Sequence, residues 1–353
     1  MKINNVSNKP EENRFRPYHI AFLAVLIVGT FIIAQREHGT QKGIPFQTEE
    51  GYIFGTTYHI KYQYEENLHD SIIARLNAID HSLSMFNPNS TVSCINRGES
   101  MKADSLIVCV WNMSQSISKE TEGAFDPTVA PLVNIWGFGF NKKQIPEKEI
   151  IDSLRELVGW QRISIQDGLF YKEDPRMIID FSAIAKGFGV DHVANLFRSM
   201  GIQNFMVEIG GEIIAQGSNF KGEAWRIGIN KPDDDSTGTN TALQEVIEVR
   251  NSALATSGNY RNFYMEGGRK IAHTIDPKTG YPAQQSILSS TVKAPSCAMA
   301  DGYATAFMVM GMEKSQEFLK KHPQLQAYFI FSDENGQYKT WHTPLFYETV
   351  KSE

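Results

Sequence analysis

The chain has 353 residues, 41% hydrophobic and 21% charged, and this composition predicts a folded globular body with a sizeable core rather than a disordered chain. Its formal net charge of −6 argues against a nucleic-acid-binding protein. The three cysteines, Cys94, Cys109 and Cys297, lie far apart without a CxxC pair, which argues against a metal-thiolate site and a disulfide scaffold.

The N-terminal segment is predicted to be an export or anchoring signal. An apolar run of 15 residues, 20–34, follows four basic residues, and it is shorter than the roughly 20 residues of a full membrane helix. A cleaved signal peptide and an uncleaved anchor both fit. A cleavage site would want small residues near the cut, but the run ends Phe31-Ile32-Ile33-Ala34 and then turns charged at Gln35-Arg36-Glu37, so we favour the anchor. Residues 1–19 would then stay in the cytoplasm, and the catalytic part would face the periplasmic or extracytoplasmic side of the inner membrane. The polar residues 35–50 are expected to form a stalk.

One domain is expected over residues 51–345, followed by a tail at 346–353. Strands are predicted at 52–64 (interrupted at Gly55-Thr56-Thr57), 177–181, 205–209, 213–216, 225–229, 246–249 and 327–331, with a hairpin over 161–172. Helices are predicted at 72–83, from the N-cap Asp104 to Gly123, from Pro146 to Gly159, and at 190–200, 297–310 and 313–321. Because helices and strands mix without a regular βαβ repeat, the predicted fold class is α+β, with mixed or antiparallel sheets and packed helices.

Two segments in the first half of the domain contain candidate binding residues. GAFDPTV, residues 123–129, follows a predicted helix and is either a turn with an aromatic core plug or part of a site. In the segment from Asp180 to Asp191, Lys186 and small residues stand between a predicted strand and a predicted helix. Backbone N–H groups at a helix start, with a lysine beside them, suit a phosphate. A solvated lysine at a helix start is the alternative.

Two further segments combine glycines with hydroxyl and imidazole groups. Gly210 and Gly211 form either a tight turn between strands or a place where a flat ring or a phosphate approaches the backbone. Ser257 stands in the segment ATSGNY, and His273 begins the segment HTIDPKTG. The turn residues of DPKTG explain a surface loop, but they do not explain the histidine before them. His273 is therefore either a structural histidine or the group that takes the proton of an attacking hydroxyl.

Asp301 and Thr305 are candidate metal ligands. They are four residues apart on a predicted helix, so their side chains lie on the same face. Two hard oxygens on one face suit Mg²⁺, which takes few protein ligands and completes its octahedron with water and substrate phosphate. A buried hydrogen bond between the two side chains is the alternative.

Taken in order, eight segments resemble the ApbE-like family of FAD:protein FMN transferases, and the resemblance runs from about Gly51 to Gly311. They are Phe54-Gly55-Thr56, the stretch Ser84-Met85-Phe86 through Ser93 to Asn96, GAFDPTV, DFSAIAKGFGVD, EIGGE, ATSGNY, HTIDPKTG and ADGYATA. The resemblance implies a single α+β domain that binds FAD, with Mg²⁺ on its pyrophosphate. FMN would pass to a threonine of an acceptor protein through a phosphoester bond.

The resemblance also assigns roles to positions of this chain. It implies that the metal is held by Asp301, Thr305 and a main-chain oxygen that we place at Ala185. Residues expected to contact FAD are Phe54, where methionine is usual, the aromatic Phe86, Ala124, Phe125 and Asp126 of GAFDPTV, Lys186 at the phosphates, Gly210, Gly211, Ser257 and His273. His273 is the candidate base and Asp276 the competing one.

The reaction and the acceptor leave alternatives open at this stage. A metal-dependent FAD pyrophosphatase would use the same metal site with water as the acceptor, and a flavin-binding carrier would hold FAD without chemistry. The family's acceptors are typically subunits of ion-pumping or electron-transfer complexes at the outer face of the cytoplasmic membrane, so an anchored enzyme would meet its partners there. The sequence does not identify the acceptor protein.

Overall fold

The computed structural model describes residues 43–348, apart from 233–241, 261, 267–268 and 285. The described residues from Pro45 onward form one compact unit, and the predicted cytoplasmic tail and the apolar run 20–34 lie outside the described residues. Within the described part, no helix combines the length and apolar character that crossing a membrane requires.

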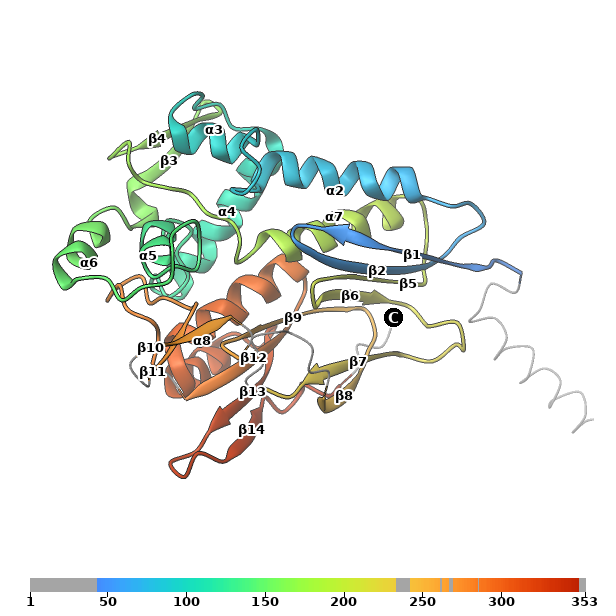
Figure 1. Ribbon diagram of the computed structural model, residues 1–353. Helices are drawn as coiled ribbons and strands as arrows, with labels where there is room; N and C mark the ends of the chain where they lie inside the picture. The colour runs from blue at the N-terminus through green and yellow to red at the C-terminus, as the bar shows by residue number, and fades with distance from the viewer. Residues whose placement is uncertain (1–42, 233–241, 261, 267–268, 285, 349–353) are drawn as a thin grey trace, which may run out of the picture. The chain divides into compact units, whose positions relative to one another are not determined.

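An eight-stranded antiparallel sheet forms the centre of the domain (Figure 1). Its order is β1-β2-β5-β6-β9-β12-β13-β14, and every neighbouring pair is antiparallel. The strands are β1 (Phe46–Ile53), β2 (Thr56–Gln63), β5 (Phe205–Ile209), β6 (Glu212–Gln216), β9 (Ser252–Gly258), β12 (Ile287–Ala294), β13 (Gln326–Ser332) and β14 (Tyr338–His342). Three separate hairpins pair β3 (Ile163–Gln166) with β4 (Leu169–Lys172), β7 (Trp225–Asn230) with β8 (Leu243–Val249), and β10 (Phe263–Glu266) with β11 (Arg269–Ala272).

Two helices, α7 and α8, pack on this sheet, and α2 packs on α7 (Figure 1). The described helices are α2 (His69–Leu83), α3 (Thr91–Arg97), α4 (Ser105–Glu120), α5 (Ala130–Ile135), α6 (Lys148–Arg155), the 3₁₀ turn η1 (Trp160–Arg162), α7 (Ala185–Ser199) and α8 (Cys297–Lys321). On α7, Val190, Val193, Ala194 and Phe197 are fully buried at the spacing of one helix face. They belong to the same core cluster as Phe205, Val207 and Ile209, which alternate along β5 with half-buried residues. The predicted α+β class with antiparallel sheets is thereby confirmed.

Most predicted elements form, with shifted ends. Asp104 caps α4 by accepting hydrogen bonds from Leu106 N and Ile107 N. The predicted strand 52–64 is a hairpin of β1 and β2 that turns at Phe54 and Gly55, both of which have positive φ. The helices predicted at 297–310 and 313–321 both form within α8, where they meet at a kink at Gly311 with φ 76° and ψ 179°.

The strand predicted at 177–181 does not form. Ile179 instead donates its N–H to the side chain of Asn96 and accepts a hydrogen bond from it, both at 2.8 Å. Asp180 N donates to the carbonyl of Pro127 at 2.7 Å. One amide side chain thus satisfies the backbone groups that a neighbouring strand would have satisfied, and the segment runs as an extended loop into α7.

The predicted domain, residues 51–345, is too short at both ends. β1 begins at Phe46, so residues 46–50 belong to the sheet rather than to the stalk. At the other end, Phe346 is fully buried, and the ammonium group of the buried Lys293 donates to the carbonyls of Phe346 and Glu348. The predicted tail therefore begins with residues that pack on the fold.

Candidate active site

A cavity of about 400 Å³ opens beside the N-terminal ends of α7 and α8. It gathers residues from the segment that follows α4, from α7, the β5–β6 turn, β7, β9, the loop after β11, and α8. Ten of the residues singled out in the sequence line it: Ala124, Phe125, Asp126, Lys186, Gly210, Gly211, Ser257, His273, Asp301 and Thr305. The sequence segments that contain them are thus brought to one place by the fold.

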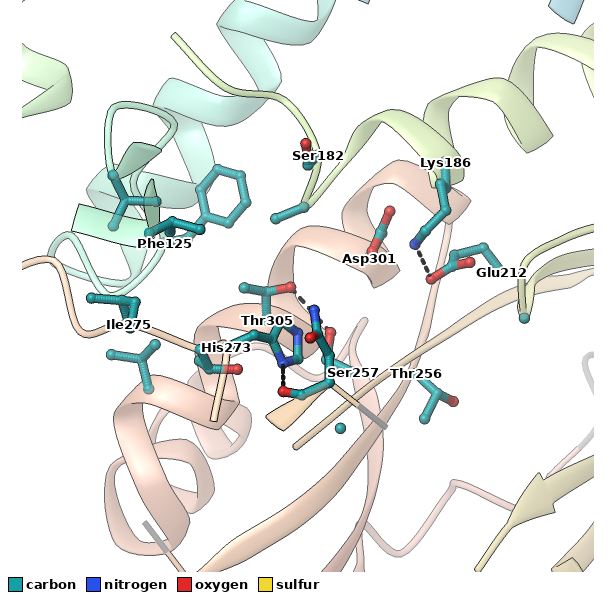
Figure 2. Close-up of a pocket in the computed structure, with 18 of the residues that line it drawn as sticks. Phe125, Ser182, Lys186, Glu212, Thr256, Ser257, His273, Ile275, Asp301 and Thr305 are labelled. Carbon is teal, nitrogen blue, oxygen red and sulfur yellow. Dashed lines mark hydrogen bonds and ion pairs between the residues drawn. The ribbon is translucent and has the colours of Figure 1, made fainter. Parts of the chain in front are cut away.

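Asp301 and Thr305 line this cavity from consecutive turns of α8 (Figure 2). Asp301 is 3% exposed, and its Oδ2 accepts a hydrogen bond from Gly187 N at 3.1 Å. The Thr305 hydroxyl pairs with Ser257 Oγ at 3.0 Å, so the alternative of an Asp301–Thr305 hydrogen bond is not what the structure has. Burial raises the pKa of the Asp301 carboxyl, whereas the charge of Lys186 and the Gly187 hydrogen bond lower it.

These residues fit Mg²⁺. In the described part of the chain no cluster of three or more His, Cys, Asp or Glu side chains could hold a metal. The two candidate ligands on α8 are one carboxylate, of Asp301, and one hydroxyl, of Thr305. A carboxylate, a hydroxyl and water or phosphate oxygens are the hard ligands that Mg²⁺ prefers. Ala185 is the first residue of α7 and lines a neighbouring cavity, while Ser182 and Ala183 line the first one. The main-chain ligand at Ala185 stays a prediction.

Lys186 lies between two buried carboxylates (Figure 2). Its Nζ donates to Glu212 Oε1 at 2.6 Å, and Asp301 is the other carboxylate that acts on it. Although burial lowers the pKa of Lys186, Asp301 and Glu212 outweigh burial and hold it above its ordinary value. The lysine is therefore a fixed positive charge at the cavity wall, as a phosphate site requires.

Glu212 was missed in the sequence as a site residue. It lines the cavity and is only 3% exposed, and its Oε2 is buried without a hydrogen-bond partner. Burial and the charge of Asp301 raise the pKa of the Glu212 carboxyl, and Lys186 lowers it. The one feature of the sequence that could have indicated Glu212 as a site residue is its position directly after Gly210 and Gly211. These glycines form the β5–β6 turn at positive φ, and a Cβ on Gly210 would lie 2.7 Å from Thr56 Cγ2.

His273 has the geometry of a proton acceptor. It lies half-buried in the cavity wall, and its Nδ1 is 3.2 Å from the carbonyl oxygen of Asn262. Because a carbonyl only accepts, Nδ1 carries the hydrogen and Nε2 keeps its lone pair. Burial lowers the pKa of the imidazole, and Lys186 lowers it further against the opposing effect of the Asn262 hydrogen bond. The ring is therefore neutral at neutral pH.

A model of the ApbE family matches residues 54–329. The chain belongs to the ApbE family. It is 38% identical over 303 residues to the FAD:protein FMN transferase of Haemophilus influenzae, covering 81% of this chain and 86% of that protein. The solved flavin transferase ApbE of Vibrio cholerae is similar with a TM-score of 0.76 at 35% identity, covering 86% of this chain and 98% of that chain. The apo form of the flavinyl transferase ApbE of Pseudomonas stutzeri is similar with a TM-score of 0.76 at 31% identity. The match covers 86% of this chain and 96% of that chain.

Two aromatic residues expected from the ApbE resemblance line a different cavity, of about 560 Å³. Phe54 and Phe86 lie there with Ala185, and this cavity shares Ser182 and Lys186 with the first. Phe86 is 63% exposed and its ring centroid is 5.4 Å from that of the exposed Phe140. Both cavities therefore open at the start of α7, where Lys186 lies.

Asp126 and Asp276, both predicted as site residues, accept hydrogen bonds from backbone N–H groups. Asp126 accepts hydrogen bonds from Thr128 N and Oγ1 and from Trp160 N, so its carboxylate orders the loop that lines the cavity. Asp276 accepts from Lys278 N and does not line the cavity, although its neighbours Ile275 and Pro277 do. Of the two candidate bases, only His273 lines the cavity beside Lys186 and Asp301.

Proposed function

We propose that this chain transfers the FMN part of FAD to a threonine hydroxyl of an acceptor protein and releases AMP, with Mg²⁺ at Asp301 and Thr305. One observation supports this most: the half-buried Lys186, an oxygen pair suited to Mg²⁺ and a neutral histidine line the same cavity. The relatives in Haemophilus influenzae and Vibrio cholerae are named FAD:protein FMN transferase, which supports the same reaction.

The chain's own residues position the substrates and move one proton. Lys186 holds the pyrophosphate, whose negative charge it offsets. Nε2 of His273 takes the proton of the acceptor hydroxyl as that oxygen bonds to the phosphorus of FMN. The bond from this phosphorus to the bridging oxygen breaks, and its electron pair leaves with AMP. When bound, Mg²⁺ would supply a Lewis acid next to the phosphate oxygens.

The test is to mix the full-length chain with FAD, Mg²⁺ and a threonine-containing acceptor peptide, and to follow the peptide by mass spectrometry. One added FMN per peptide, with AMP released in equal amount, is the expected result. AMP and free FMN without a peptide adduct would instead identify a pyrophosphatase. Unchanged FAD after long incubation would identify a flavin-binding protein.

The ion pair between Lys186 and Glu212 gives a prediction in which the effect on stability can be separated from the effect on activity. Lys186→Met is expected to abolish transfer and to lower the stability of the fold, because Glu212 then stays buried without its positive partner. The expected loss is about 1–3 kcal/mol, below that for a fully buried pair because Lys186 is 29% exposed. The double variant Lys186→Met/Glu212→Gln should recover the melting temperature but not the transfer activity. Recovery of transfer would contradict a role for Lys186 at the phosphates.

The same single variant should show a pH dependence. Without Lys186, the folded-state pKa of Glu212 is raised further above its unfolded value, so the folded state binds more protons. The stability deficit of Lys186→Met relative to the double variant should therefore grow as the pH rises from the ordinary glutamate range toward the folded pKa. Thermal melts of both variants over that range measure it, and a deficit that shrinks with pH would contradict this charge assignment.

The location of the enzyme is part of the same proposal. Residues 20–34 anchor the chain in the inner membrane, and the catalytic domain faces the extracytoplasmic side, where acceptor subunits of electron-transfer or ion-pumping complexes present their threonines. The apolar run and the preceding basic residues support this. After an alkaline wash of membranes, the full-length chain should stay in the pellet. A soluble product shortened at its N-terminus would show a cleaved signal peptide instead.

A further inference from the structure

Helices α7 and α8 satisfy each other's N-terminal amides. On α7, Asp191 accepts hydrogen bonds from Cys297 N at 2.8 Å and Ala298 N at 2.9 Å, the first two residues of α8. In return, Asp301 of α8 accepts from Gly187 N in the first turn of α7 at 3.1 Å. These three hydrogen bonds form what we term the reciprocal cap.

The reciprocal cap replaces caps that the local sequence does not supply. The first amides of a helix have no partner within it. Ile184 precedes α7 and offers no side-chain cap, while Ser296 caps only Met299 N of α8. The amides of Gly187, Cys297 and Ala298 are satisfied by a carboxylate of the facing helix. A change in either carboxylate therefore affects how the two helices meet, rather than one helix end alone.

The two helix ends also meet backbone to backbone. A Cβ on Gly187 would lie 2.4 Å from the carbonyl oxygen of Cys297, so only glycine permits this approach. Asp191 is 8% exposed, and Cys297 is fully buried. Because the two backbones approach directly at Gly187 and Cys297, the reciprocal cap fixes the position of α8 relative to Lys186.

We propose that Asp191 is a positioning residue for the metal site. By holding the first turn of α8 on α7, it sets where Asp301 and Thr305 stand relative to Lys186, although Asp191 itself does not line the cavity. This inference rests on the proposed function, because it concerns the Mg²⁺ that Asp301 and Thr305 would hold. Residues that orient metal ligands commonly affect metal affinity by about 10- to 100-fold.

The test compares two helix-capping aspartates in the full-length chain. Asp191→Asn weakens the reciprocal cap, and Asp104→Asn is the matched control, because Asp104 caps α4 through two amides and does not line the cavity. Both variants should lower the melting temperature. Only Asp191→Asn should raise, by about 10-fold or more, the Mg²⁺ concentration for half-maximal FMN transfer. The same shift should appear in the Mg²⁺ dependence of FAD binding, followed by flavin fluorescence without acceptor.

The outcomes separate the inference from the function beneath it. An unchanged Mg²⁺ requirement in Asp191→Asn, or equal shifts in both variants, would overturn the positioning role. If Asp191→Asn does not fold, Asp191→Glu replaces it in the test. This variant keeps the carboxylate but places it one methylene further along the side chain, so the Mg²⁺ requirement should again rise. An unchanged Mg²⁺ requirement in Asp191→Glu would overturn the proposal. Transfer without any Mg²⁺ dependence in the unaltered chain would instead refute the proposed metal.

Discussion

Replacing Asp301 by alanine should abolish FMN transfer while the chain stays folded. The substitution removes the only carboxylate that α8 presents to the cavity among the described residues, and Mg²⁺ binding by neutral oxygens alone is weak. Loss of one charge-stabilising group in such sites costs roughly 100- to 1000-fold in rate, and loss of the ion itself costs more. The rate of adduct formation, measured by mass spectrometry at fixed FAD and Mg²⁺, checks the prediction.

The fold should tolerate the change with a modest loss of stability, because it removes one hydrogen bond of the reciprocal cap and leaves the two that Asp191 accepts. Burial raises the pKa of its carboxyl, which means that the folded state disfavours the charged form. Lys186 keeps Glu212 as its partner after the substitution. Asp301→Asn, which retains an acceptor for Gly187 N, should therefore melt close to the unaltered chain and still fail to transfer FMN.

Thr305 supplies the matched comparison on the next turn of the helix. Thr305→Ser keeps the hydroxyl that pairs with Ser257 and should retain most of the activity, whereas Thr305→Val keeps the shape and should lose it. Full activity of Asp301→Ala at ordinary Mg²⁺ concentrations would contradict the metal assignment. Equal activity of the two Thr305 variants would remove the hydroxyl from the ligand set.

The sequence predicted elements whose pattern is local and missed those whose partners are distant. Asp104 can be predicted as the N-cap of α4 because it directly precedes the helix and bonds to amides only two and three residues ahead. By contrast, β12 is buried at nearly every position and so shows no alternation, and it was not predicted. The apolar stretch 177–181 predicts a strand, but the side chain of Asn96 takes the place of a neighbouring strand. No pattern within 177–181 contains that information.

The same limit applies to the site. The spacing of Asp301 and Thr305 on one helix correctly placed them on one side. Their actual partners, Gly187 and Ser257, depend on how α7 and β9 pack against α8. The sequence does not mark Glu212 as a site residue, because a glutamate after two glycines is typical of an ordinary turn. Its meaning appears only once the β5–β6 turn brings it against Lys186.

Replacing His273 by asparagine should slow transfer far more than it weakens FAD binding. Asparagine keeps a polar side chain in the wall but cannot take a proton, and loss of a general base costs about 100- to 10,000-fold. Single-turnover transfer and FAD titration by fluorescence separate the two effects. Equal losses in both would point to a binding role for the imidazole.

The pH profile decides whether the proton goes to His273. Transfer by the unaltered chain should fall as the pH falls through the pKa of His273, because protonation fills the lone pair on Nε2. Since burial lowers that pKa, the acidic limb should lie below the range of an exposed histidine. His273→Asn should lose this limb and keep only a low, flat rate. Asp276→Asn should keep both the transfer rate and the acidic limb of the pH profile, because the Asp276 carboxylate accepts a hydrogen bond from the backbone of its own turn. If the acidic limb were lost in Asp276→Asn and kept in His273→Asn, Asp276 would be the base.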